Sequence, residues 1–195
     1  MRKDKGFTFF ELTVVLAIGL ILTGIGLPRM NTVIANMKLR SSMTTLSGFL
    51  QNVRMLAIKR DRTVTARYFN RTTLPNSLVY YAKEAADMSA MTVTDSQVEL
   101  EAPIDPYDAP SGPGAPAAIT NAQMGLLSGT ALTSNPSFNS RGLPCSFSGG
   151  SCNSAAFVKY FKDNRISGPG AWSAISISPA GRIKRWFWNG SLWTD

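Results

Sequence analysis

The sequence predicts an α+β protein in which a long N-terminal helix, first transmembrane and then amphipathic, packs on a C-terminal head of antiparallel β-sheet. Two observations predict this architecture. An almost uncharged apolar run near the N-terminus leads into a stripe of apolar residues at helical spacing. The rest of the chain holds short segments rich in β-branched and aromatic residues, separated by turns that contain glycine and proline.

The composition limits the size and the chemistry of the protein. With 195 residues, the chain has room for one domain and one additional element. A hydrophobic fraction of 44% with 16% charged residues excludes a disordered chain. Histidine, the commonest general base and zinc ligand, does not occur in the sequence. We therefore expect no enzyme, no cofactor and no metal site, and we interpret Asp105 and Asp108 as part of a solvated loop rather than a weak calcium site.

The apolar run is long enough to cross a membrane as a helix. From Phe7 to Leu27 there are 21 residues with one charge, Glu11. A helix of that length spans about 31 Å, close to the thickness of a bilayer core. The basic residues Arg2, Lys3 and Lys5 precede the run and predict a cytoplasmic N-terminus, with the rest of the chain outside.

Three ordinary interpretations compete for this run: a cleaved secretory signal peptide, a plain single-pass anchor and a buried core helix. A signal peptide has a shorter apolar region and a small-residue cleavage site, and core helices are usually shorter than this run. A plain anchor explains the length but leaves Glu11 without a reason. A carboxylate inside an apolar span is costly unless it is paired, so Glu11 indicates a function.

The segment Lys5-Gly6-Phe7-Thr8-Phe9-Phe10-Glu11, with the apolar run and Pro28 behind it, resembles the class III signal of type IV pilins and type II secretion pseudopilins. The resemblance implies cleavage after Gly6 by a prepilin peptidase, N-methylation of Phe7, and partnership with other pilin subunits and an inner-membrane assembly platform. It also implies that Glu11 meets the new amine of a neighbouring subunit. Four segments follow: a leader at 1–6, a transmembrane or filament-core helix at 7–28, an amphipathic helix at 29–60 and a β-rich head at 61–195.

Physical chemistry supports the role of Glu11 independently. The amine left at Phe7 and the Glu11 carboxylate would lie in the same apolar surroundings, where opposite charges neutralise each other better than either could alone. Gly19, Gly24 and Pro28 weaken the end of the apolar run, so we expect a kinked or locally melted helix there. Ordinary glycine use in a membrane helix remains an alternative interpretation.

The helix is expected to continue to Arg60. Its apolar stripe has spacings of four and three residues, which is typical of an amphipathic helix packed on a sheet and also of a coiled coil. The stripe consists of Leu39, Met43, Leu46, Leu50, Val53 and Ala57.

The head is expected to be built of strands. The predicted strands are Val64–Tyr68, Leu78–Tyr81, Val98–Leu100, Phe157–Phe161, Ala174–Ser178 and Arg182–Trp188. The turn Ser178–Gly181 joins the last two as a hairpin, and Asn189-Gly190 can turn the chain into a final short strand. The segment Ala102–Pro116, which contains five prolines, is interpreted as a loop.

Two motifs in the C-terminal half, Phe138-Asn-Ser-Arg-Gly-Leu143 and Ser178-Pro-Ala-Gly-Arg182-Ile-Lys184, resemble the head of GspH/FimT-type minor pilins and pseudopilins. The resemblance implies a head of antiparallel strands in two sheets on the second half of the helix. Residues 82–135 match no motif, so the number of strands there stays open. Cys145 and Cys152 enclose six residues outside the cytoplasm, where disulfides persist, and we expect a bridge that staples a hairpin or turn.

Charge is unevenly distributed along the chain. The formal net charge is +8: residues 29–71 carry +8, residues 81–140 carry −6, residues 141–195 carry +5, and the first 28 residues carry the remaining +1. This pattern suits contacts between subunits and also an anionic partner. The basic residues Arg182, Lys184 and Arg185 alternate with tryptophans, a composition that could bind DNA phosphates and stack on bases.

The segment Gly181-Arg182-Ile183-Lys184 resembles the Gly-Arg-x-Arg motif of FimT-type pilins linked to DNA uptake, with lysine in place of the last arginine and thus without its bidentate fork. The competing interpretation packs the tryptophans on the head. The sequence thus predicts a minor subunit of a type IV pilus or a type II secretion pseudopilus, which supports filament assembly. The alternative is a DNA-binding pilin at a filament tip, and the sequence leaves open both the machine and the abundance of the subunit.

Overall fold

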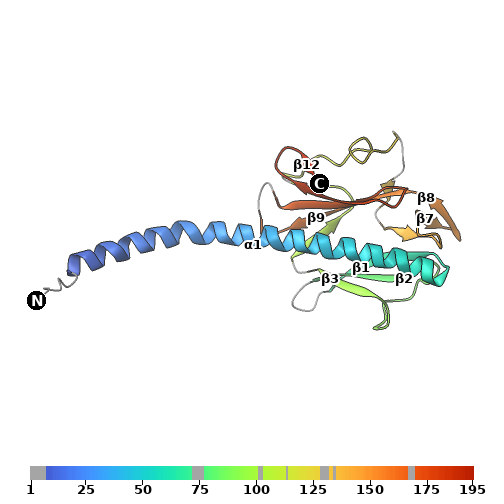
Figure 1. Cartoon of the computed structure of the whole chain (residues 1–195), viewed down its shortest axis with the longest axis horizontal. Coiled ribbons are helices and arrows are strands. Elements are labelled where there is room, and N and C mark those ends of the chain that lie inside the picture. Colours follow the sequence, from blue (N-terminus) through green and yellow to red (C-terminus); the bar gives the residue numbers. More distant parts are fainter. Residues whose placement is uncertain are drawn as a thin grey trace, which may run out of the picture.

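A computed structural model of the chain describes residues 8–71, 77–100, 103–112, 114–127, 132–133, 135–166 and 170–195, without the side chains of 25–29 and 133. Helix α1 (Phe9–Arg60) extends far beyond the head at its N-terminal end and lies along the head with its second half (Figure 1). It ends where Asp61 takes the left-handed conformation, with φ of 51°, which aspartate tolerates better than most residues. There the backbone N–H of Asp61 donates to the carbonyls of Ala57 and Ile58.

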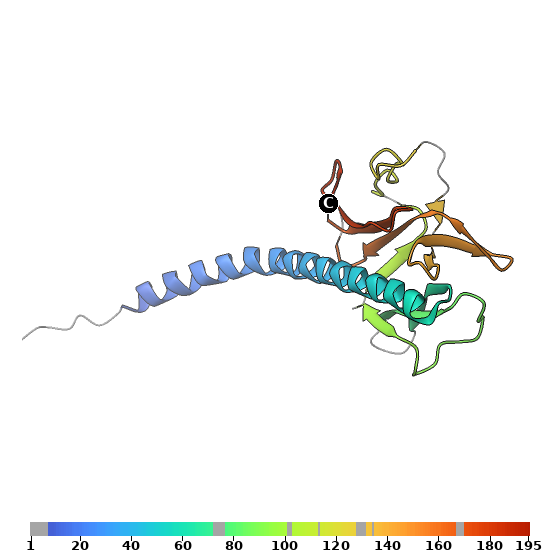
Figure 2. The same ribbon diagram turned by 45° about the vertical axis from the view of Figure 1, so that its right-hand side comes forward.

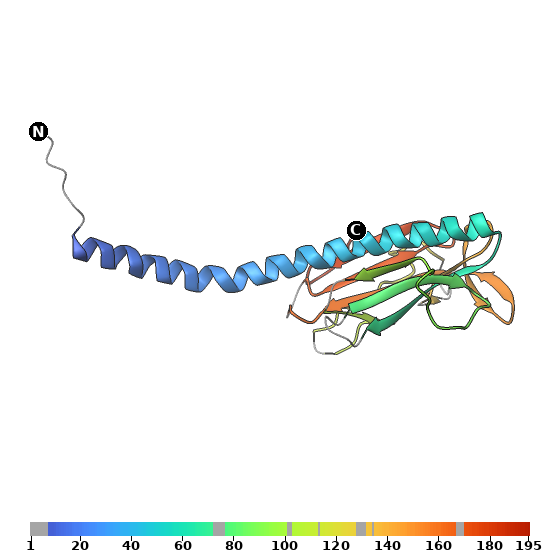
Figure 3. The same cartoon turned by 90° about the horizontal axis from the view of Figure 1, so that it is seen from below.

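The helix is continuous through Gly24, Gly26 and Pro28, so the prediction of local melting is wrong. A proline removes one hydrogen bond from a helix, and the remaining turns can absorb the defect as a bend. Figure 3 shows the corresponding curvature in the half of α1 that leaves the head. This half therefore reaches away from the head as one curved rod.

The amphipathic second half packs as the sequence predicts. Every residue of the predicted stripe is at most 2% exposed. Phe49 lies beside the stripe and is 6% exposed. The stripe contacts residues of both sheets of the head in one core, so the coiled-coil alternative is not needed.

The first sheet has the strand order β3-β2-β1-β6-β7-β8, with each neighbouring pair antiparallel. Its strands are β1 (Val64–Arg71), β2 (Ser77–Glu84), β3 (Gln97–Leu100), β6 (Ser137–Phe138), β7 (Pro144–Ser148) and β8 (Ser151–Ser154). Hairpin β7–β8 lies at the end of the head that is farthest from the N-terminus of α1 (Figures 1 and 2).

The second sheet has the order β12-β11-β10-β9-β4, and β5 pairs with β9 in parallel. Its strands are β4 (Ile104–Tyr107), β5 (Leu132–Thr133), β9 (Ala156–Asp163), β10 (Trp172–Ile177), β11 (Ile183–Trp188) and β12 (Trp193–Thr194). All six predicted strands and the final short strand are confirmed, most of them with different ends.

The predicted loop Ala102–Pro116 is partly wrong, because it contains β4. Pro106 lies within this strand, opposite Phe161 of β9. Proline is tolerated at the edge of a sheet, where its missing N–H costs no ladder bond, and β4 ends the strand order of its sheet. The prolines of the segment favour a loop in the sequence alone, and this edge strand was therefore missed.

The second sheet is covered on both faces. One face joins α1 and the first sheet in the main core. The other face packs against the segment of residues 114–127 through Ile119 and Met124. The N–H of Ile119 donates to the Tyr160 hydroxyl at 2.8 Å, and Trp193 Nε1 donates to the carbonyl of Ala117 at 2.8 Å. Residues 114–127, which belong to the segment that matches no motif, therefore cover this face of the second sheet.

Candidate assembly surfaces

The first half of α1 exposes apolar side chains around its whole circumference. Phe9 is 83% exposed, Leu20 is 75% exposed and Val15 is 62% exposed. Seven further large apolar side chains of this half are also exposed, namely Phe10, Leu12, Val14, Leu16, Ile18, Ile21 and Leu22. A helix that is apolar all round is normally buried by a membrane or by other protein. This half of α1 is therefore a surface that needs an apolar partner.

Glu11 lies in the first turn of α1, where it closes a capping box with Thr8. The Glu11 carboxylate accepts from the Thr8 N–H and from the Thr8 hydroxyl, both at 3.0 Å. The Glu11 N–H in turn donates to Thr8 Oγ1 at 3.3 Å. This arrangement satisfies two N–H groups at the start of the helix. The carboxylate is exposed, so it is also accessible to a cation from another chain.

The predicted processing residues Gly6 and Phe7 lie outside the described residues. Pro28 lies within the continuous helix. In the part of the chain described with side chains, no helix is both long enough and apolar enough to span a membrane. The predicted transmembrane segment is therefore not confirmed.

The predicted disulfide is confirmed. Cys145 of β7 and Cys152 of β8 are joined, with their Cα atoms 5.3 Å apart. Phe147 lies opposite Cys152 in the register of the two strands, so the bridge crosses hairpin β7–β8 diagonally. It staples the hairpin that forms the far end of the head, as the close spacing predicts.

The basic residues of the C-terminal hairpin point to different surroundings. Lys184 Nζ donates to the Asp195 carboxylate at 2.9 Å and thereby holds the pKa of that carboxyl below its usual value, with a smaller effect from Arg182. Arg185 lies on the opposite face of β11 and donates to Thr44 Oγ1 of α1 at 2.8 Å. The Arg182 side chain is exposed at the turn. The three residues therefore do not form one binding face.

Two of the three tryptophans, Trp186 and Trp193, cannot stack on bases as predicted because the head buries them, whereas Trp188 is half-buried. Trp186 is 4% exposed and its Nε1 donates to Ser176 Oγ at 2.8 Å. Trp193 is 7% exposed beneath residues 114–127. The competing interpretation, in which the tryptophans pack on the head, is correct for these two. Contact of the basic residues with DNA stays a prediction.

Two turns of nearly identical construction are the feature that sequence reasoning missed. In residues 139–143, the N–H of Asn139 donates to the carbonyl of Leu143 at 3.0 Å. In residues 178–182, the N–H of Ser178 donates to the carbonyl of Arg182 at 3.0 Å. In each turn the first side chain accepts from the N–H of the fifth residue. We call these two segments the twin turns.

Both twin turns have a glycine at the fourth position, and both glycines lie against Arg54 of α1. Gly142 and Gly181 have φ of 75° and 82°, in the left-handed region that favours glycine. A Cβ atom at Gly142 would lie 3.1 Å from Arg54 Nε, and one at Gly181 would lie 3.2 Å from Arg54 Nη1. The repeated spacing of glycine after a capping residue was the available signal in the sequence.

Residues 1–27 match the prokaryotic N-terminal methylation motif. This motif is the signal of type IV pilins and pseudopilins, and it includes Gly6, Phe7 and Glu11. No curated protein and no solved structure matches the chain. The motif indicates a type IV pilin-like or pseudopilin protein that assembles with other pilins.

Proposed function

We propose that the chain is a minor subunit of a type IV pilus or of a type II secretion pseudopilus. A prepilin peptidase removes residues 1–6, and the helix of residues 7–28 then leaves the membrane to pack among the helices of other subunits. The observation that carries this proposal is the exposed apolar half of α1 joined to the methylation motif. Apolar burial stabilises association by roughly 25 cal/mol per Å², so a rod of this kind has a strong drive to assemble.

Glu11 gives this assembly its register. After cleavage the α-amino group of Phe7 is the only cation at the start of an otherwise apolar helix. The Glu11 carboxylate of an adjacent subunit compensates that charge inside the bundle of helices, where an unpaired charge would be costly. The exposed position of Glu11 next to Thr8 is consistent with this role.

The test is mass spectrometry of the protein isolated from filaments. The expected mature chain begins at N-methylated Phe7, and Gly6→Val should leave the precursor uncleaved and absent from filaments. Lys5→Gln, which changes a neighbouring leader residue, serves as the control and should be processed. Filaments that contain the chain with an intact Met1 would overturn the proposal. Its abundance relative to the main pilin in the same sample tests the minor role.

Binding of duplex DNA by a subunit at the filament tip is the second candidate function. It is favoured by the exposed guanidinium of Arg182 at the turn between β10 and β11. The expected result is a salt-sensitive shift of a labelled duplex by the full chain in detergent, which Arg182→Ala with Lys184→Ala abolishes. Absence of a shift at low salt would eliminate this candidate.

A further inference from the structure

Arginines line one flank of α1, where the helix meets the hairpin of β10 and β11. The guanidinium of Arg40 lies 4.5 Å from the ring centroid of Phe187. Farther along α1, Arg185 donates to Thr44, and Arg54 lies against both twin turns. The turns add one exposed arginine each. We call this set the arginine strip, and it consists of Arg40, Arg54, Arg141, Arg182 and Arg185.

The strip is a row and not a compact cluster. Positions 40, 44, 54 and 58 recur on one side of a helix with 3.6 residues per turn. From Arg40 to Arg54 the helix rises about 21 Å, so the guanidinium groups are spread along the head. A row of this length fits an extended surface of a macromolecule better than a single small anion.

The arginines of the strip form no close ion pair with a carboxylate in the described part of the chain, and Arg182 acts on Asp195 only from a longer distance. Among the residues that the structure describes, no Asp or Glu oxygen lies within 4.0 Å of a nitrogen of these five side chains. Four of the five are exposed and Arg54 is half-buried. Arginine keeps its charge at every physiological pH, so the strip is a permanently positive part of the surface.

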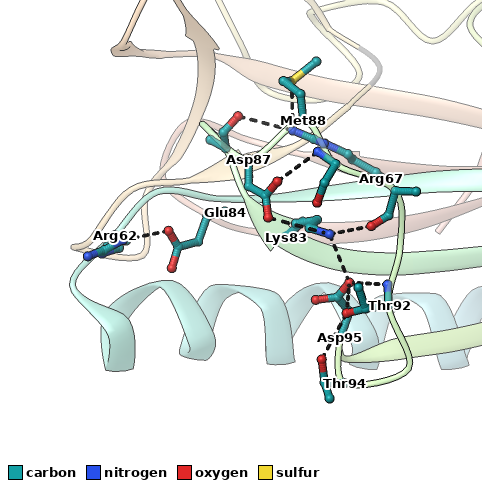
Figure 4. A network of polar contacts seen from close by, with 12 residues as sticks. Arg62, Arg67, Lys83, Glu84, Asp87, Met88, Thr92, Thr94 and Asp95 are labelled. Atoms are coloured by element: carbon teal, nitrogen blue, oxygen red, sulfur yellow. Dashed lines mark hydrogen bonds and ion pairs between the residues drawn. The ribbon is translucent and has the colours of Figure 1, made fainter.

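The carboxylates of the head are in the opposite situation, because most of them are paired within the chain. Lys83 lies between Asp87 and Asp95, at 3.6 and 3.5 Å, and Arg62 pairs with Glu84 at 2.9 Å (Figure 4). Further pairs in the head are Arg71–Glu99, Lys159–Asp108, Arg165–Asp163 and Lys184–Asp195. In the described part of the head, Asp61 and Asp105 are the carboxylates outside such pairs. A second copy of the chain therefore offers little free negative charge to the strip.

Exposed apolar side chains lie beside the strip. Ile58 is 43% exposed and contacts Gly142 of the first twin turn, and Leu143 in that turn is 41% exposed. Met55 follows Arg54 on α1 and is 62% exposed. Interfaces between proteins combine apolar contacts with arginine, whereas the contacts of DNA-binding proteins to the phosphate backbone are mainly polar. The mixed surface favours a protein partner over nucleic acid.

We propose that the arginine strip docks a different protein subunit, one whose head presents carboxylates beside apolar side chains. The inference rests on the proposed function, since the partner is a neighbour in the same filament. The twin turns hold Arg54 in place before the partner arrives, which lowers the entropy lost on docking. Exposed ion pairs are individually weak, but a row of them selects an acidic neighbour over a copy of this basic chain.

Site-specific photo-crosslinking in cells that assemble the filament tests this proposal. The full chain carries benzoylphenylalanine in place of Met55, beside the strip, or in place of Val15, on the exposed half of α1. Mass spectrometry identifies the product at each site. The expected product at position 55 is another protein with an N-terminal methylation motif and an acidic head.

Charge variants show whether the arginines cause the contact. Arg141→Gln with Arg182→Gln should reduce the product at position 55 by about tenfold, because two charged contacts are lost. Both side chains are exposed, so the fold should survive, and intact Cys145–Cys152 bridging checks this. Arg71→Gln removes a positive charge from β1, outside the strip, and should leave the yield unchanged.

The outcomes separate this proposal from the proposed function. Products at position 15 with none at position 55 would keep the filament subunit and eliminate the docking surface. The docking surface would also be eliminated if the product at position 55 contained a second copy of the chain or an unrelated protein. A product that disappears on nuclease treatment would eliminate it as well. An undiminished yield in the charge variants would do the same. Absence of products at both positions would contradict the proposed function itself.

Discussion

Arg54 of α1 and Gly181 of the turn between β10 and β11 lie against each other, although 127 positions separate them. A Cβ atom at position 181 would lie 3.2 Å from Nη1 and 3.3 Å from Cζ of Arg54. The turn can approach the helix this closely because glycine has no side chain. Gly142 of the other twin turn lies equally close to Arg54, so both turns pack against the same arginine.

Gly181→Ala should destabilise the protein by about 2–3 kcal/mol, since it adds both left-handed strain and crowding against Arg54. Gly149 is a matched control, because its φ is 57° and a Cβ there would have open space. Gly149→Ala should cost only about 1 kcal/mol of strain. Chemical denaturation followed by tryptophan fluorescence measures both. Equal costs for the two variants would show that the contact with Arg54 contributes nothing.

Lys83→Met should loosen the loop between β2 and β3. Lys83 is 6% exposed. Its ammonium donates to the carbonyl of Ala90 at 2.5 Å and pairs with Asp87 and Asp95. Its removal leaves those partners uncompensated, at a cost of about 2 kcal/mol in the free energy of unfolding.

Lys184→Met is the matched control for this variant. Lys184 also pairs with an aspartate, but that partner, Asp195, is exposed at the C-terminus. The cost of this substitution should be below about 1 kcal/mol. Limited proteolysis should cleave residues 85–96 of the Lys83 variant and spare them in the control. Resistance of that loop in both variants would contradict the role of Lys83.

The same loop should open at acidic pH. The N–H of Thr92, the N–H of Ser89 and the Lys83 ammonium hold the pKa values of Asp95 and Asp87 below the usual 3.8. Carboxyls with lowered pKa stabilise the fold fully above that usual value, and this contribution is lost as the pH falls through the lower folded values. Amide hydrogen exchange of residues 85–96, corrected for intrinsic rates, should accelerate below pH 3.8. Asp87→Asn with Asp95→Asn should remove the pH dependence of this exchange. If exchange of the loop accelerates equally in the doubly substituted protein, the two carboxyls are not its cause.

Glu11→Ala should reduce incorporation into filaments without unfolding the head. The expected loss is at least about tenfold, because an amine buried without its carboxylate costs several kcal/mol. Thr8→Ala separates this role from helix capping, since it removes the two capping bonds of the Thr8 hydroxyl and keeps the carboxylate with its bond from the backbone N–H of residue 8. If capping were the whole function of Glu11, both variants would be incorporated equally poorly. Quantitative immunoblotting of filaments and membranes provides the measurement.

Local patterns predicted most of the elements correctly. The stripe from Leu39 to Ala57 has helical spacing, and the strands of the second sheet are rich in β-branched and aromatic residues, so both carry their own signal. Short strands such as β6 and β8 were not predicted, because segments of two to four residues are too short to show a periodicity. Strand β4 was missed because its proline is acceptable only at a sheet edge, and the edge position is a property of the whole sheet.

The sequence by itself determined the long helix, the apolar surface of its first half, the methylation motif and the disulfide pair, since each depends on residues close together in the chain. Only the tertiary structure decided the surroundings of the charged and aromatic side chains. It buried Trp186 and Trp193, paired Lys184 with Asp195, and brought Arg54 to both twin turns. The contacts of Arg54 and Trp193 join segments that are far apart in the sequence, and the pair of Lys184 with Asp195 depends on the position of β12 beside β11. They form because α1 buries its apolar stripe against both sheets at once, and no local pattern records which distant segment will lie beside a given residue.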